Sequence, residues 1–288
     1  MNKTHFNKIL IGFAFSPNLK ANVFEAMRLA EFLGAHLYFL HVGSKSPAKA
    51  KTFSEILEES PGQPKNFTVL WYEGTPIETI SEQCKKNQIN LLLLGAMQRE
   101  NMLKFYMGSI ARKLTRNAPC SVLLMMKPSV VRKPSQHVVV NAFESPKTES
   151  TIRAAFHFAQ ALSATKLTLV EEIDRSEVAE EADDDRGLRK VTLRKEKLKR
   201  RELSRVREIL THIPDTLKEN IKIHSQSIFG TRGYSIGHYA KVVRADLLIM
   251  NSDEKRKRFL ERIFPKDLEH ILSELPTDVL IIKSKENG

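Results

Sequence analysis

Five short apolar segments occur in the same order in each half of the 288-residue sequence. Continuous runs of Val, Ile and Leu without polar alternation are typical of strands that are covered on both faces. The matched pairs are Lys8–Phe13 with His137–Ala142, His36–Val42 with Lys166–Glu172, Phe67–Tyr72 with Ile221–Ser227, Asn90–Gly95 with Asp246–Asn251, and Ser121–Met126 with Asp278–Lys283. The sequence therefore predicts one arrangement of strands that is built twice.

Segments with helical periodicity lie between these strands. Asn22–Leu33 and Ser150–Leu162 each place their apolar residues on one stripe, and Pro76–Lys85 and Tyr234–Val243 precede the fourth strand of each half. Strands that alternate with helices of this length indicate βαβ units and a parallel sheet with right-handed crossovers. We therefore expect an α/β protein with two doubly wound, five-stranded parallel-sheet domains.

The spacing of the repeat indicates where the two domains differ. The first matched pair is separated by 129 residues, whereas the last two pairs are separated by 156 and 157. The second half therefore carries about 27 additional residues, and the charged stretch at about 171–210 is the candidate. Lys127–Gln136 contains two prolines and three basic residues and is the expected linker between the two domains. We expect domains at 1–130 and 131–288.

Cysteine content and hydropathy indicate a cytoplasmic protein. The sequence has two cysteines, Cys84 and Cys120, which fits a reducing compartment and excludes a disulfide framework. Both lie near apolar segments and are expected to be small core residues. The longest apolar runs, such as Leu91–Leu94, are far shorter than the roughly 20 residues of a membrane span, and the N-terminus does not read as a signal peptide.

The segment that follows the fourth strand of the first half is suited to an anion. Gly95 leaves the strand, and Gly108 and Ser109 open the next helix. Glycine permits close backbone approach, a helix N-terminus presents unpaired N–H groups, and Ser109 adds a hydroxyl donor. The alternative is structural, with Gly95 as a turn and Ser109 as a helix cap.

The same segment resembles the universal stress proteins. That family has Gly, two residues, Gly, nine residues and then Gly-Ser or Gly-Thr after its fourth strand, and this sequence has Gly95, Gln98 and Gly108-Ser109 at that spacing. The approach to the fifth strand, Asn117–Leu124, and the turn Glu73–Pro76 are also similar to the family. The resemblance covers the chain twice, so it resembles a tandem universal stress protein.

The resemblance implies a Rossmann-like fold of the adenine-nucleotide alpha-hydrolase type, with two domains packed as a pseudo-dimer through their fifth strands. It also implies that ATP or ADP binds in the first domain. Gly95, Gly108 and Ser109 match the phosphate-contacting positions, Gln98 occupies the remaining position of that motif, and Val42 matches a backbone contact on the adenine side.

Two positions of the first half depart from the family pattern. Ala14 stands where nucleotide-binding members have an acidic residue that holds the nucleoside, and Gln98 replaces the second motif glycine. In the second half, Phe143 takes the acidic position, the loop reads Asn251–Arg258, and Phe264-Pro265 replaces Gly-Ser. These departures predict a degenerate motif and no nucleotide site in the second half.

Two further segments of the second half allow more than one interpretation. Gly230–Gly233 could wrap a phosphate with Arg232 as the charge partner, although a flexible turn before a helix is the simpler interpretation. The insert holds eleven basic and three acidic residues between Arg186 and Ile209, after nine acidic residues between Glu171 and Asp185. It could be a basic amphipathic helix that contacts an acidic surface, or a solvated helix with internal salt bridges.

The sequence contains no Gly-x-Ser-x-Gly elbow, no Walker lysine motif and no His-Glu-x-x-His. We therefore expect a non-catalytic, cytoplasmic universal stress protein that acts in stress response or signalling through a ligand- or partner-dependent conformation. The alternatives are an ATP- or ADP-binding protein with slow turnover, as a weak ATPase, and a scaffold that uses the basic insert. The expected partner is a protein or a second copy of the chain. The diffuse +12 charge argues against nucleic acid, and the narrow stripe of the insert argues against a membrane. No metal site is expected.

Overall fold

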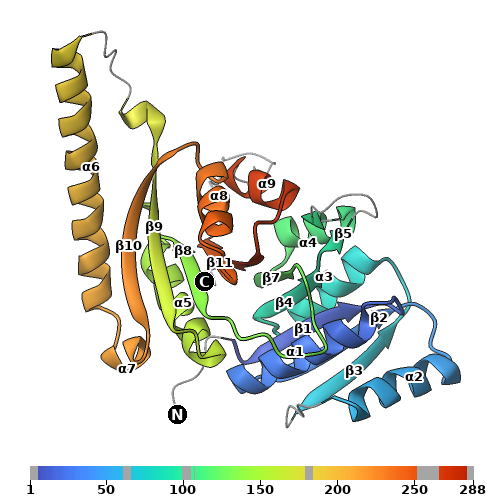
Figure 1. Cartoon of the computed structure of the whole chain (residues 1–288). Helices are drawn as coiled ribbons and strands as arrows, with labels where there is room; N and C mark the ends of the chain where they lie inside the picture. The colour runs from blue at the N-terminus through green and yellow to red at the C-terminus, as the bar shows by residue number, and fades with distance from the viewer. Residues whose placement is uncertain are drawn as a thin grey trace. The chain divides into compact units, whose positions relative to one another are not determined.

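The computed structural model describes residues 6–60, 66–98, 105–106, 108–178, 184–251 and 266–283. Internal contacts divide the chain into two units. Unit 1 comprises Met1–Ser135 together with Asp278–Gly288, and unit 2 comprises Gln136–Thr277. The parallel α/β architecture expected from the repeat is therefore present in two compact parts (Figure 1).

Unit 1 follows the strand and helix order that the sequence predicts. Its strands are β1 (Lys8–Phe13), β2 (His36–Val42), β3 (Phe67–Tyr72), β4 (Leu91–Gly95), the short pair β5 (Met97–Gln98) and β6 (Phe105–Tyr106), β7 (Ser121–Met125) and β12 (Asp278–Ile282). Its helices are α1 (Leu19–Leu33), α2 (Pro47–Glu58), α3 (Pro76–Lys86) and α4 (Ser109–Asn117). The bounds of the first three strands agree with the expected ones.

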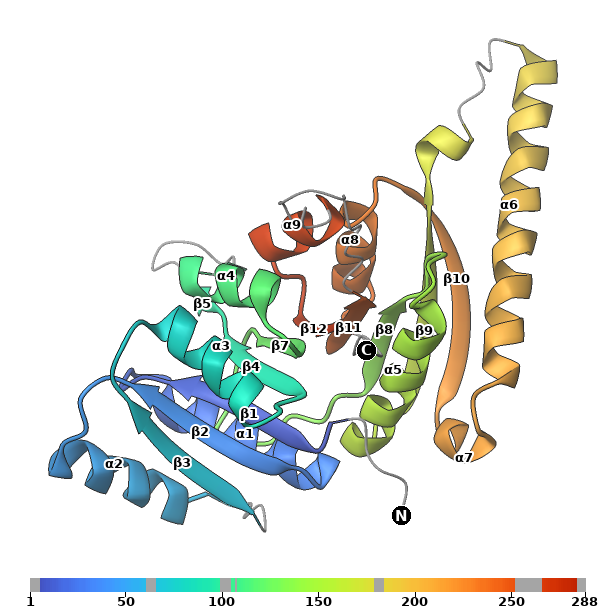
Figure 2. The ribbon, with the colours of Figure 1, turned by 180° about the vertical axis from the view of Figure 1, so that it is seen from behind.

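The main sheet of unit 1 has the order β12-β7-β4-β1-β2-β3, and every neighbouring pair except β12 and β7 is parallel. Helices α1 and α2 cover one face, and α3 and α4 cover the other (Figures 1 and 2). β1 lies between β4 and β2, so consecutive connections leave it in opposite directions. Ligands of open parallel sheets bind beside such a switch point, at the carboxyl ends of the strands.

Unit 2 repeats this arrangement with one longer helix. Its sheet has the order β10 (Lys222–Gly230), β9 (Lys166–Asp174), β8 (His137–Asn141) and β11 (Leu247–Asn251), all parallel. Its helices are α5 (Thr148–Leu162), α6 (Asp185–Thr211), α7 (Asp215–Lys218), α8 (Tyr234–Val242) and α9 (Lys266–Ser273), and the short 3-10 helix η1 (Arg175–Glu177) follows β9. Helix α6 takes the place that α2 has in unit 1, so the insert lengthens one crossover and leaves the sheet order unchanged.

The last strand of the sequence belongs to the sheet of unit 1. β12 pairs antiparallel with β7, and Val279, Leu280 and Ile281 lie opposite Leu124, Leu123 and Val122. These are the two fifth strands that were expected to pair. The Asp278 carboxylate accepts a hydrogen bond from the N–H of Met126, and the Lys283 ammonium donates to the carbonyls of Arg116 and Ala118. The sheet of unit 1 is therefore completed by residues about 150 positions away in the sequence.

This pairing predicts that a substitution in β12 destabilises unit 1. Leu280 is fully buried, and truncation of a buried leucine to alanine costs roughly 2–5 kcal/mol. Trp71, on β3 of unit 1, is the single tryptophan of the protein. In urea unfolding followed by Trp71 fluorescence, Leu280→Ala should lower the midpoint clearly, whereas Val131→Ala, at a side chain that is 72% exposed, should not. An unchanged midpoint for Leu280→Ala would mean that β12 does not support unit 1.

Candidate functional site

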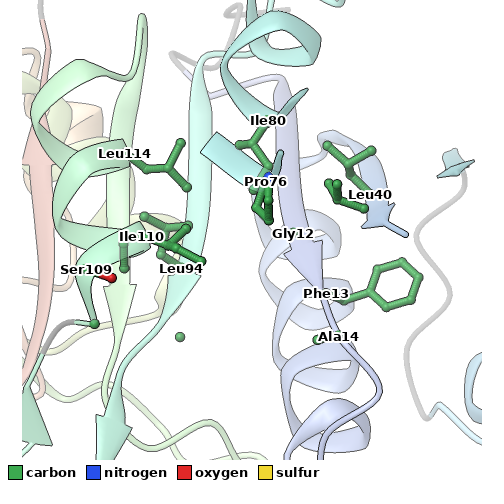
Figure 3. A pocket seen from close by; sticks show the side chains of 14 residues that line it. Gly12, Phe13, Ala14, Leu40, Pro76, Ile80, Leu94, Ser109, Ile110 and Leu114 are labelled. Atoms are coloured by element: carbon green, nitrogen blue, oxygen red, sulfur yellow. The ribbon is translucent and has the colours of Figure 1, made fainter. Parts of the chain in front are cut away.

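A cavity of about 350 Å³ opens at the carboxyl ends of β1, β2 and β4 in unit 1, on the face that α3 and α4 cover. Its lining includes the strand residues Gly12, Leu40 and Leu94 and the helix residues Ile80, Ile110 and Leu114 (Figure 3). Register places Gly12 beside Leu40, so both side-chain positions point to the same face of the sheet. The cavity is mainly apolar and lies where a parallel sheet binds its ligands.

Four of the five predicted site residues line this cavity, namely Val42, Gly95, Gly108 and Ser109. Gln98 lies in β5, where it pairs with Phe105 of β6. The placement of its side chain falls outside the described part of the structure, as does the loop 99–104. The structure thus brings together residues that are up to 67 positions apart in the sequence, because strand ends and helix starts meet at one edge of the sheet.

Helix α4 begins at the cavity without a side-chain cap. Its N-cap is Gly108, with φ −61° and ψ 163°, and no side chain there accepts a hydrogen bond from the first turn. The first N–H groups of a helix have no partner inside the helix, and they carry a partial positive charge. Because φ is negative at Gly108, the backbone does not require glycine at this position. The missing side chain instead leaves the start of α4 open to the cavity.

Gly12 contributes to the cavity and was not identified from the sequence. A Cβ atom at this position would lie 3.1 Å from Cδ1 of Ile80 on α3. A larger residue at this position, near the carboxyl end of β1, would therefore press on α3 or fill the cavity. A glycine inside an otherwise aliphatic strand is the signal that could have identified it, since such glycines often mark a close approach.

The opposite face of the same strand ends carries a cluster of rings, formed by Phe13, Phe15, His41, Phe53 and Trp71. The rings of Phe13 and Phe53 stack with centroids 4.3 Å apart. The Nδ1 atom of His41 lies 3.1 Å from the carbonyl oxygen of Phe13. Ala14 lies at the edge of the cavity between Phe13 and Phe15 and brings no carboxylate to it. This cluster fixes the backbone that forms the cavity wall.

The corresponding strand ends of unit 2 are arranged differently. Glu172 stands where Val42 stands in unit 1, and its buried carboxylate accepts hydrogen bonds from the N–H groups of Gly233 (2.9 Å) and Ile236 (3.0 Å) at the start of α8. The N-terminus of α8 is therefore satisfied by the protein itself. Gly230–Gly233 is a turn before a helix, with Gly233 as the N-cap at φ +77°. Within the predicted loop Asn251–Arg258, only Asn251 lies in the described part, and Phe264-Pro265 lies outside it.

Helix α6 is the charged insert, and it packs onto the sheet of unit 2 through Leu198, Glu202 and Val206, which are spaced four residues apart. Its N-terminal part exposes Leu188 and Leu193. Several of its cations have partners, including Arg201 and Arg205 on Glu202 and Arg200 on Glu196. The expectation of a salt-bridged helix fits these contacts, and binding of an acidic surface stays a prediction.

Other candidate groups have structural surroundings. Cys84 and Cys120 are both buried, and contact with Cys120 together with burial raises the pKa of the Cys84 thiol far above its ordinary value, so it is not an activated nucleophile. Among the residues that the structure describes, no three His, Cys, Asp or Glu side chains are grouped as metal ligands. Likewise, no helix in the described ranges is both long and apolar enough to cross a membrane.

The fold and the cavity define a parallel α/β protein with a cavity at the start of the helix that follows the fourth strand. Residues 5–125 match the universal stress protein family. A universal stress protein of Methanocaldococcus jannaschii is 27% identical over 124 residues, which is 36% of this chain and 72% of the relative. The family match therefore covers the first of the two repeats, which is also the repeat that carries Gly95, Gly108 and Ser109.

Solved structures match the whole chain. A functionally unknown protein from Pseudomonas aeruginosa has a TM-score of 0.71 at 15% identity, and covers 99% of this chain and 96% of its own. A universal stress protein from Archaeoglobus fulgidus has a TM-score of 0.69 at 15% identity, with coverage of 98% and 99%. Residues 5–125 therefore match the universal stress protein family, and the full chain has the fold of these solved structures.

The Glu172 contacts predict a structural role for this carboxylate. Glu172→Val places the unit 1 residue at this position and leaves two buried N–H groups at the start of α8 without their acceptor. The cost should be about 1–3 kcal/mol in free energy of unfolding. Chemical denaturation followed by far-UV circular dichroism measures it, with the exposed Glu208→Val as the control. Equal stability of the two variants would show that the α8 terminus does not depend on Glu172.

Proposed function

We propose that unit 1 binds an adenine nucleotide without catalytic turnover and that a protein partner reads the bound state. The observation that carries the proposal is the uncapped start of α4, at Gly108 and Ser109, which opens into the cavity. A phosphate there would accept hydrogen bonds from the free N–H groups and from the Ser109 hydroxyl. Residues 5–125 belong to a family whose motif supplies these positions, which supports the assignment.

The rest of the cavity suits the uncharged part of such a ligand. Gly12, Leu40 and Ile80 provide apolar walls against which a planar base can pack. Val42, at the end of β2, offers its backbone for hydrogen bonding beside that surface. An apolar cavity with a few polar groups at one end is the usual form of a small-molecule site.

The described lining of the cavity holds no group that could act as an acid or a base in hydrolysis. The described residues that line it are glycine, alanine, proline, leucine, isoleucine, valine and phenylalanine, together with the hydroxyl of Ser109, and they include no acid or base. General acid–base chemistry requires a titratable group within reach of the reacting atoms. A binding role in stress response or signalling therefore fits the lining better than an ATPase does.

Ala14 predicts weak discrimination of the ribose. With no carboxylate to accept hydrogen bonds from the sugar hydroxyls, ATP and deoxy-ATP should bind with dissociation constants within about threefold of each other, because no charged hydrogen bond separates them. Ala14→Asp should tighten ATP binding by at least about tenfold, through one or two charge-assisted hydrogen bonds. Titration calorimetry of the full chain measures both effects.

The same titration identifies the phosphate end of the site. Gly108→Val should abolish the heat of ATP binding because a branched side chain would stand at the start of α4, while the negative φ allows the chain to fold. The exposed Val131→Ala serves as the matched surface control. Absence of binding to the unaltered protein, or full binding to Gly108→Val, would contradict a phosphate at α4.

A further inference from the structure

Unit 2 contains a second cavity, of about 530 Å³, at the carboxyl end of β9. Residues of β9, the segment after β8, the turn before α8 and helix α6 line it. Its lining is polar, unlike that of the cavity in unit 1, and carries six carboxylates and two guanidinium groups. Glu171 on β9 and Arg201 and Glu202 on α6 form the part of the cavity that lies beneath α6.

Strand register shows what changed between the two repeats at this place. In unit 1, Phe13, His41 and Trp71 lie side by side on β1, β2 and β3 and pack as rings. In unit 2, Glu171 pairs with Ser227 across β9 and β10 at the same level. Ala142, which directly follows β8, takes the position of Phe13. Its N–H donates a hydrogen bond to the carbonyl of Val170.

Three rings are thus replaced by a methyl group, a carboxyl group and a hydroxyl group. The replacement removes most of the ring volume on the α6 face and places polar atoms there. A cavity at a place where unit 1 holds packed rings must be filled by a ligand or by water.

Glu171 is the carboxyl group of this cavity that lacks a hydrogen-bond partner among the described residues, and the Nε atom of Arg232 lacks one as well. Glu171 is 1% exposed, and neither carboxyl oxygen has a hydrogen-bond partner among the described residues. The nearby Ser227 hydroxyl favours the ionised carboxyl but does not reach hydrogen-bond geometry. A buried carboxyl group without a donor is costly, so its retention calls for a donor supplied from outside.

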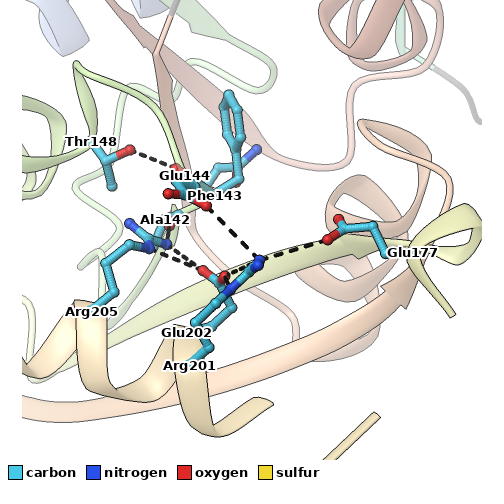
Figure 4. A network of polar contacts seen from close by, with 9 residues as sticks. Ala142, Phe143, Glu144, Thr148, Glu177, Arg201, Glu202 and Arg205 are labelled. Atoms are coloured by element: carbon cyan, nitrogen blue, oxygen red, sulfur yellow. Dashed lines mark hydrogen bonds and ion pairs between the residues drawn. The ribbon is translucent and has the colours of Figure 1, made fainter. Parts of the chain in front are cut away.

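The neighbouring carboxylates already have donors. Glu202 accepts hydrogen bonds from Arg201 (2.8 Å) and Arg205 (3.0 Å), as Figure 4 shows. The Arg201 guanidinium lies 3.6 Å from Glu177 and 3.9 Å from Glu144. Asp174 accepts from Ser176, and Glu172 is held by the start of α8. Arg201 is half exposed, so the cavity reaches solvent along this side.

We propose that the cavity beneath α6 binds a small organic cation whose ammonium or guanidinium group donates to the buried carboxylate of Glu171. The carboxylates outnumber the guanidinium groups in the lining, which makes the cavity attractive to cations. The Nε atom of Arg232 also lacks a hydrogen-bond partner in the described part of the chain, but the Cζ atom of its guanidinium lies 5.3 Å from the ring centroid of Phe143, so its charge has an aromatic partner. The Glu171 carboxyl group has no hydrogen-bond partner among the described residues. This site lies in unit 2 and the proposed nucleotide cavity lies in unit 1, so a negative result for one proposal leaves the other unaffected.

The charge state of Glu171 makes ligand binding dependent on pH. Burial, and then repulsion from Glu202, raise the pKa of Glu171 to about 8, although Arg205 and Arg201 on α6 oppose the shift. The empty site therefore holds a proton at pH 7, which a bound cation must expel. Cation affinity should rise about tenfold per pH unit below pH 8 and level off above it.

The test is titration calorimetry of the full chain with 1,4-diaminobutane at pH 7, in two buffers of different ionisation enthalpy and at constant ionic strength. We expect saturable binding with release of close to one proton per ligand. Glu171→Gln should weaken binding at least about tenfold and abolish the proton release, because the amide has no charge and does not titrate. Glu208→Gln, on an exposed part of α6, should change neither.

Four results would overturn the proposal. The first is an absence of binding heat with both 1,4-diaminobutane and its guanidinium analogue agmatine, and the second is equal binding of the diamine by Glu171→Gln. The third is binding without proton release, and the fourth is saturable binding of the dianion succinate in place of the diamine. Succinate binding that is lost in Arg232→Gln would instead assign the cavity to anions. Circular dichroism of each variant establishes that the fold is retained.

Stability gives a second readout that needs no ligand. From the ordinary pKa of 4.5 up to about 8, the unfolded chain loses the Glu171 proton while the folded chain keeps it. The free energy of unfolding of the unaltered protein should therefore fall, relative to Glu171→Gln, as the pH rises through this window. A difference between the two proteins that does not vary with pH would show that Glu171 is ionised when the site is empty, and would overturn the proton linkage.

Discussion

Alternation of side chains along parallel strands is the constraint on which the functional surfaces of this protein depend. At the carboxyl edge of each sheet, neighbouring residues on one strand point to opposite faces. In unit 1, Gly12, Leu40 and Val42 therefore face α3 and α4, while Phe13 and His41 face α2. One set forms the wall of a cavity and the other forms a packed cluster of rings. A change at either set alters one face and leaves the other intact.

The two units use this constraint in opposite ways. Unit 1 keeps the α4 face open and fills the α2 face with rings. Unit 2 closes the α8 terminus with Glu172 and opens a polar cavity on the α6 face next to Glu171. These two acidic residues are adjacent in the sequence and perform different tasks because they point to opposite faces. Divergence of a duplicated fold can thus move a potential site from one face of a sheet to the other without altering the order of the strands.

Much of the fold could be predicted because its signals are local. Apolar runs such as Lys8–Phe13 and Phe67–Tyr72 are β-strands with the bounds expected from the sequence. The spacing of Gly95, Gly108 and Ser109 also identified the positions that meet at the cavity. The surroundings of Gly12, His41 and Glu171 could not be predicted because they come from other elements. Gly12 lies against Ile80 of α3, His41 packs on Trp71 of β3, and helix α6 covers Glu171.

The sequence by itself determined that one α/β arrangement occurs twice, that the fourth-strand motif is partly retained in the first copy and degenerate in the second, and that the second copy carries a charged insert. These properties depend on residue type and spacing along the chain. The tertiary structure decided that β12 completes the sheet of unit 1, that Glu172 seals the start of α8, and that α6 covers a buried, unpartnered carboxyl group. The physical reason is that pairing, capping and burial depend on which distant groups are brought within a few ångströms, and spacing along one strand does not specify its neighbours.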